Sequence, residues 1–150
     1  MTHFRTFIHS VLLITLLGAL LSLSACKLSS SSTKADATLT ANSEVPATKS
    51  TGSGEAKIDI DVKADKLSWV ITYSGLSGVV TGAHFHGPAE AGANASVAIP
   101  ITGDLLSPMK GEATITAAQK AELLAGKWYV NLHTAANPEG EIRGQVMVNR

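Results

Sequence analysis

GAHFHGP, residues Gly82–Pro88, is the stretch from which both the fold and a candidate site can be worked out. Its alternating side chains are typical of a strand, and Gly-Pro is typical of the turn that ends one. Residues two apart in a strand point to the same face, so His84 and His86 are predicted on one face and Phe85 on the other. If Phe85 faces the core, both imidazoles lie on the polar face.

A second stretch, WYVNLHT at Trp128–Thr134, has the same character. Its apolar residues Val130 and Leu132 fall on one face of a predicted strand. The polar members share the opposite face: Tyr129, Asn131 and His133. If the two stretches are neighbouring strands, three imidazoles meet on one surface.

The rest of the chain shows the period-two pattern of short strands. Glu55–Val62 alternates cleanly and Leu67–Tyr73 follows after a turn, so the two form a predicted antiparallel hairpin. Further strands are expected at residues 37–41, 79–86, 96–101, 111–115, 127–133 and 141–149, with residues 135–140 as a turn connection. This spacing predicts an all-β fold, an antiparallel Greek-key-like β-sandwich.

One short helix is predicted at about residues 117–125. Thr116 and Gln119 have the spacing of a capping box at its start. Gly126 suits the position just after its end.

Residues 1–25 have the features of a bacterial lipoprotein signal peptide. Arg5 precedes an apolar run, Val11–Leu21, which is shorter than the roughly 20 residues of a membrane-spanning helix. The following Leu23–Cys26 (LSAC) resembles a lipobox, which makes Cys26 the predicted lipidation site. Ordinary secretion with a free thiol is the alternative.

Residues 26–35 are rich in serine and are expected to form a flexible tether before a folded domain at 36–150. Cys26 is the single cysteine, so an intrachain disulfide is excluded. Lys27 follows it and, by resemblance to the enterobacterial sorting pattern, favours the outer membrane. The protein is therefore predicted to be lipid-anchored in the cell envelope, with the membrane as its partner.

The charge balance excludes one class of partner. The chain has 12 basic and 12 acidic residues. It has no basic cluster of the kind that a phosphate backbone requires, so nucleic-acid binding is discarded. Arg143 and Gln145 are expected on a solvated strand face.

Four motifs resemble one known family. They are NSEVP at residues 42–46, AHFHGPA at 83–89, LAGKWYVNLHT at 124–134 and NPEGEIRGQ at 137–145. Together they span about residues 38–148 and make the chain similar to the chordin-type, or CHRD, domain, which would occupy residues 36–150. The resemblance implies a β-rich extracytoplasmic domain and no established enzymatic activity.

A weaker likeness concerns the histidines. A Gly-x-His-x-His strand followed by a distant histidine is similar to the copper half of copper/zinc superoxide dismutase, also a Greek-key β-sandwich. The mature chain has no histidine left for a metal-bridging or fourth copper ligand, and one cysteine cannot supply the stabilising disulfide. These departures put dismutase activity in doubt.

Three functions remain open. The first is a non-catalytic binding module for contacts with a protein partner or a ligand, since no activated nucleophile is evident and no catalytic residue is predicted. The second is a copper- or zinc-binding protein that uses His84, His86 and His133, with Tyr129 and Asn131 orienting the rings. The third, and least favoured, is a dismutase-like oxidoreductase.

Two alternatives to a metal site made of three histidines alone remain open: added carboxylate ligands, or no metal. Carboxylate ligands could come from Glu44, Glu139 or Glu141. The alternative to any metal is structural: His84 or His86 would then bond to the Gly87-Pro88 turn, and His133 would brace residues 137–140.

Overall fold

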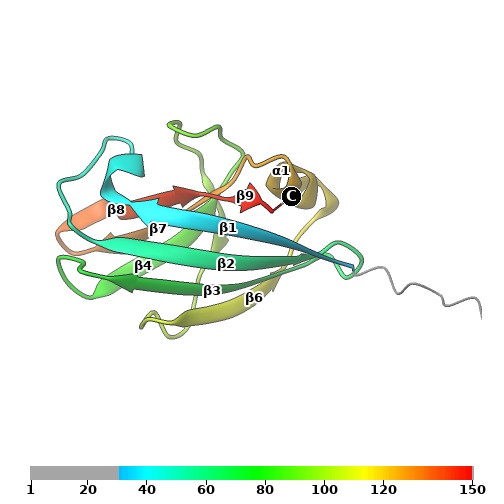
Figure 1. Ribbon diagram of the computed structural model, residues 1–150, viewed down its shortest axis with the longest axis horizontal. Helices are drawn as coiled ribbons and strands as arrows, with labels where there is room; N and C mark the ends of the chain where they lie inside the picture. Colours follow the sequence, from blue (N-terminus) through cyan, green and yellow to red (C-terminus); the bar gives the residue numbers. More distant parts are fainter. Residues whose placement is uncertain (1–30, 150) are drawn as a thin grey trace, which may run out of the picture.

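The computed structural model describes residues 31–149, and within them the chain forms nine strands and two short helices (Figure 1). The strands are β1 (Ser32–Thr40), β2 (Ser53–Asp61), β3 (Lys66–Ser74), β4 (Val80–His86), β5 (Val97–Pro100), β6 (Met109–Thr114), β7 (Tyr129–Thr134), β8 (Asn137–Gln145) and β9 (Met147–Val148). The helices are the 3-10 helix η1 (Ala41–Ser43) and the α-helix α1 (Ala117–Leu124).

The strands form one antiparallel sheet that curls around the core. Their order is β5-β4-β7-β8-β1-β2-β3-β6, and β9 pairs with β1 outside this series. In Figure 1, β1, β2 and β3 lie nearer the viewer than β4 and β8. Trp69 of β3 meets Phe85 of β4 across the interior, with ring centroids 5.2 Å apart. The prediction of an all-β antiparallel fold is confirmed. The two layers expected of a sandwich are the two halves of a single, nearly closed sheet.

The β2–β3 hairpin is confirmed and supplies much of the core. Ile58 pairs with Trp69 in its antiparallel register. The side chains that alternate inward from the two strands are at most 6% exposed: Ala56, Ile58, Ile60, Leu67, Trp69 and Ile71. Their burial supplies the apolar driving force that fixes which face of each strand points inward.

Strands β4 and β7 are neighbours, as the histidine pattern requires. In their register His84 lies opposite Asn131, and His86 lies opposite Tyr129. The side chains that point into the core are almost completely buried: Ala83, Phe85, Val130 and Leu132. Strand alternation therefore places all three histidines on the outer face of the sheet.

The single predicted α-helix is confirmed within a residue of its expected end. The Thr116 hydroxyl accepts from the Gln119 backbone amide, and the Gln119 side chain accepts from the Thr116 backbone amide. Gly126 follows with φ +72°, a left-handed conformation that a glycine adopts without strain. Leu123 buries the apolar side of the helix against the core.

Two segment assignments need correction. β1 begins at Ser32, so residues 32–35, which composition assigned to the tether, belong to the sheet because they pair with β2. Asn137–Gly140 is not a loop but the start of β8, since Asn137 already pairs with Thr134. In both places polar composition hid a strand that pairing with its neighbours stabilises.

The signal peptide predicted at residues 1–25 and the lipidation site Cys26 lie outside the described residues. Within residues 31–149, no helix has the length and apolar character needed to cross a membrane.

Candidate metal centre

Three imidazoles come together on the outer face of β4 and β7. His84 Nδ1 lies 3.0 Å from His133 Nε2. The ring centroids of His84 and His86 are 5.5 Å apart. One nitrogen from each of the three rings can be chosen so that all lie within 4.8 Å of one another. The structure thus brings together the three histidines predicted as metal ligands.

Backbone carbonyls fix the tautomers of two rings. His86 Nδ1 lies 3.0 Å from the Ala95 carbonyl oxygen, and His133 Nδ1 lies 2.9 Å from the Pro138 carbonyl oxygen. A carbonyl only accepts, so each Nδ1 carries a proton and donates it. In the neutral form of each ring, Nε2 is therefore unprotonated and carries a lone pair.

These contacts also bear on the structural alternative. His133 does brace the segment 137–140, through Pro138. The expected bond to the Gly87-Pro88 turn is not made. His86 Nδ1 donates to the Ala95 carbonyl and its Nε2 lies 3.1 Å from Asn131 Oδ1, while His84 faces His133. The reason is that the 89–96 loop folds back over His86, as its contact with Ala95 shows.

Tyr129 and Asn131 both contact the histidines. The Tyr129 ring stacks on the His86 ring at 4.8 Å, with an interplanar angle of 2°. Asn131 Oδ1 lies 3.1 Å from His86 Nε2 and 3.0 Å from His133 Nε2. Both residues are 3% exposed, which restricts their own movement and hence that of the rings they touch.

The outer face of β4 and β7 is covered at His86, while His84 and His133 are half-buried. His86 is only 9% exposed, and the 89–96 loop is the reason. Burial, and then the charges of His133 and His86, lower the pKa of His84. Burial also lowers the pKa of His86, against the opposing effect of its bonds to Ala95 and Asn131. Both rings are consequently neutral at pH 7, the form in which imidazole binds metals.

Arg143 is the largest correction to the sequence-based expectations at this site. It is 2% exposed instead of solvated. Its guanidinium carbon lies 3.3 Å from the centroid of the Tyr129 ring, and Nη1 donates to Asn94 Oδ1 at 2.9 Å. Nη2 donates to the Ala93 carbonyl. Arg143 therefore holds the 93–95 loop against the ring that stacks on His86.

The three candidate carboxylates behave differently. None is among the residues whose ligand atoms cluster with the histidines. Glu141 is completely buried and accepts from Ser50, Ser77 and Thr134. Glu139 is exposed at the edge of the site.

Glu44 is buried beside the site, a position that the sequence did not predict. It is 7% exposed, and its buried Oε1 has no hydrogen-bond partner among residues 31–149. Burial raises the pKa of Glu44 to about 7, although Arg143, Val45 and Asn131 act in the opposite direction. Glu44 Oε1 and Asn131 Nδ2 both adjoin Gly140, and Asn131 Oδ1 contacts two of the histidines.

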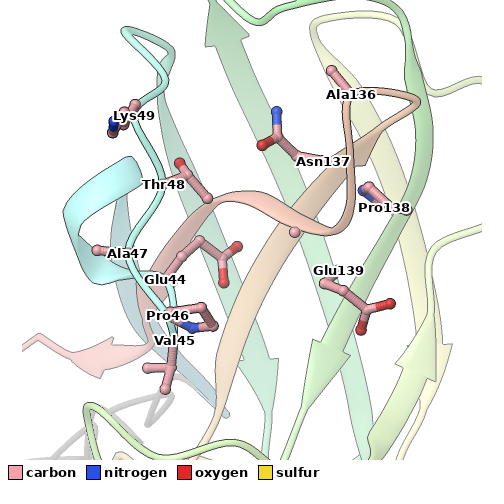
Figure 2. A pocket seen from close by; sticks show the side chains of 11 residues that line it. Glu44, Val45, Pro46, Ala47, Thr48, Lys49, Ala136, Asn137, Pro138 and Glu139 are labelled. Atoms are coloured by element: carbon pink, nitrogen blue, oxygen red, sulfur yellow. The ribbon is translucent and has the colours of Figure 1, made fainter.

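Two cavities adjoin this network. One, of about 350 Å³, is lined by Glu44, Val45, Pro46, His86, Asn94, Ala95, Tyr129, Asn131 and Glu139. The other, of about 490 Å³, lies between residues 44–49 and 136–140. Figure 2 shows the Glu44 side chain pointing from the first of these segments toward the second. The first cavity therefore reaches His86 and Asn131, and neither cavity is lined by His84 or His133.

Comparison with known proteins identifies the family. The sequence matches the CHRD domain over residues 35–146, which covers most of the chain and includes β4, β7 and all three histidines. Searches of curated proteins and of solved structures found no match. The chain belongs to the CHRD-domain family.

Proposed function

We propose that this CHRD domain is a non-catalytic binding module that holds a divalent transition-metal ion between His84, His86 and His133. One observation carries the proposal. With Nδ1 protonated, the Nε2 lone pairs of His86 and His133 both face the oxygen of Asn131 at 3.0–3.1 Å. Three electron-rich atoms at this separation repel one another unless a cation or a proton lies among them.

The donor set indicates which ions would bind. Imidazole suits zinc and copper, and Cu²⁺ binds nitrogen donors most tightly among the first-row divalent ions. The contacts of His86 and His133 with backbone carbonyls are of the kind that orient metal-binding rings and raise their basicity. Zinc and Cu²⁺ are accordingly the ions to test.

A hydrolytic role is not supported by the contacts. Ser77 lies near the histidine strand in sequence, but its hydroxyl donates to the Glu141 carboxylate. A serine nucleophile needs a base such as imidazole to take its proton. We therefore propose binding, and storage or transfer of the metal, rather than catalysis.

The site is proposed to lie in the cell envelope, attached to the membrane through lipid on Cys26. The signal and lipobox at residues 1–26 support this location. Changing Cys26→Ser is expected to move the protein from the membrane fraction to the soluble fraction, because a lipid anchor would no longer form. Equal membrane association of the two proteins would contradict the anchor.

Thermal unfolding of the full chain, purified without a histidine tag, tests metal binding. Zinc at a hundred times its dissociation constant adds about 2.7 kcal/mol of stability, which raises the midpoint on the order of 10 °C. The triple variant His84→Ala, His86→Ala, His133→Ala is expected to lose this gain. A midpoint that zinc and Cu²⁺ leave unchanged would refute the proposal.

A matched control separates this site from surface binding. Asp59 and Asp61 are an acidic pair on the outer side of β2, and Asp59 is ion-paired with Lys34. The variant Asp59→Asn, Asp61→Asn is expected to retain the full response to zinc. If this control loses the response as well, zinc is acting at the surface carboxylates.

A further inference from the structure

Asn131 occupies the position of a fourth ligand beside the three imidazoles. Its Oδ1 is 3.1 Å from His86 Nε2 and 3.0 Å from His133 Nε2, while His84 Nδ1 is 3.0 Å from the same His133 nitrogen. In a tetrahedral site with bonds of about 2.0–2.1 Å, neighbouring ligand atoms are about 3.3 Å apart. The contacts that Asn131 makes thus have nearly the spacing of ligands around one ion.

The Asn131 amide lies between Gly140 and the histidines. The amide oxygen is on the histidine side, 3.1 Å from His86 Nε2 and 3.0 Å from His133 Nε2. Gly140 permits this arrangement: a Cβ at that position would lie 2.4 Å from Glu44 Oε1 and 2.9 Å from Asn131 Nδ2. The amide is 97% buried by this packing, since Asn131 is 3% exposed.

We infer that Asn131 Oδ1 is the fourth ligand of the metal site, an inference that rests on the proposed function. The ion is then enclosed by three nitrogens and one oxygen, with no position open to water or substrate. Zinc sites with four protein ligands are structural, whereas catalytic sites keep one position open. A closed site fits an ion that is held or passed on.

The amide oxygen also narrows the class of metal. Oxygen donors are hard ligands, and Cu⁺ prefers the sulfur of cysteine or methionine. Met109 points into the core, and no other sulfur from residues 31–149 lies among the residues that form or line the site. The site is therefore expected to select divalent ions such as Zn²⁺, Co²⁺ and Cu²⁺ over Cu⁺.

Cobalt alone is the probe for the test, because its visible absorption bands report the ligands around it. The full chain is loaded with one equivalent of Co²⁺ and titrated with azide, a small anion that binds at an open position. The spectrum of the wild-type protein is expected to stay unchanged. The variant Asn131→Ala is expected to bind cobalt about 10–100-fold more weakly and to change its spectrum when azide is added.

Asn131→Asp keeps the side-chain volume and retains an oxygen donor. Its cobalt spectrum is expected to resist azide, as that of the wild type does, while the added carboxylate beside the buried Glu44 opposes a gain in affinity. It also keeps the test decisive if the alanine variant does not fold. A wild-type spectrum that responds to azide, or an alanine variant whose cobalt spectrum and affinity equal those of the wild type, would overturn the inference.

Failure of the proposed function looks different. If the three histidines do not bind metal, the wild-type protein shows no cobalt spectrum that saturates, or the triple histidine variant gives the same cobalt spectrum as the wild type. If cobalt binds through the histidines but azide binds to the wild type too, only the role of Asn131 as a ligand is lost.

Discussion

Replacing Glu141 by alanine is expected to destabilise the domain by about 3–5 kcal/mol, as judged by urea unfolding at pH 7. The buried carboxylate accepts from the Ser50 hydroxyl at 2.7 Å, from the Ser77 amide at 2.7 Å, and from the hydroxyls of Ser77 and Thr134. These donors come from separate segments, so one side chain ties the 50 and 77 loops to β7. Alanine would leave the buried Thr134 hydroxyl without this acceptor and release the Ser50 and Ser77 segments.

The same carboxylate predicts a pH dependence. Burial raises the pKa of Glu141, but its hydrogen bonds outweigh this effect and hold the pKa at about 2. Since the pKa of Glu141 is lowered in the folded state, its ionised carboxylate adds to the unfolding free energy above pH 4.5. This contribution is lost as the pH falls toward 2.

Glu141→Gln is the control for that dependence, because glutamine has nearly the same volume and no titration. The difference in unfolding free energy between wild type and this variant is expected to shrink as the pH falls from 5 to 2. A difference that stays constant over this range would contradict the account of Glu141.

Replacing Arg143 by alanine is expected to cost about 2–4 kcal/mol in unfolding free energy. The guanidinium group stacks on Tyr129 and donates to Asn94 and Ala93, so its loss frees the loop that covers His86. Because Tyr129 in turn stacks on His86, zinc binding is expected to weaken roughly tenfold, although no ligand is removed. Urea unfolding and zinc titration measure the two effects.

Arg143→Lys distinguishes charge from shape at this position. Lysine keeps the cation but cannot stack as a plane or donate to two acceptors in the same geometry. The lysine variant is therefore expected to lie between wild type and alanine in both measurements. An alanine variant within about 0.5 kcal/mol of wild type would show that Arg143 does not hold the loop.

The strands of the core were predictable because their patterns are local. Glu55–Val62 and Leu67–Tyr73 alternate so cleanly that a shift of one residue would turn every apolar side chain outward. The structure pairs them as the β2–β3 hairpin. The capping box of α1 was equally predictable, since Thr116 and Gln119 act within one helical turn.

The burial of the charged residues around the site was not predictable in the same way. Glu44 follows the 3-10 helix η1 and Arg143 lies on β8; both are charged, and charged residues are ordinarily solvated. Each is buried because a segment distant in sequence covers it, as the bonds from Arg143 to the 93–94 loop show. Alternation predicts which face a residue points to, but not whether a loop packs over that face.

The histidine cluster was predictable only in part. Alternation placed His84 and His86 together on one face, and that required no tertiary information. Their approach to His133 depends on β4 pairing with β7 in a register that puts Gly82 opposite His133. A β-bulge adjusts that register between Val80 and Gly82, a detail that the sequence pattern does not contain.

X-ray absorption of the zinc-loaded full chain is the most direct test of the three-histidine site. We expect one zinc ion per chain, with Zn–N distances of about 2.0–2.1 Å and the multiple-scattering signature of three imidazoles. The triple histidine variant should lose this signal. Zinc surrounded by oxygen atoms alone in the wild-type protein would contradict the site.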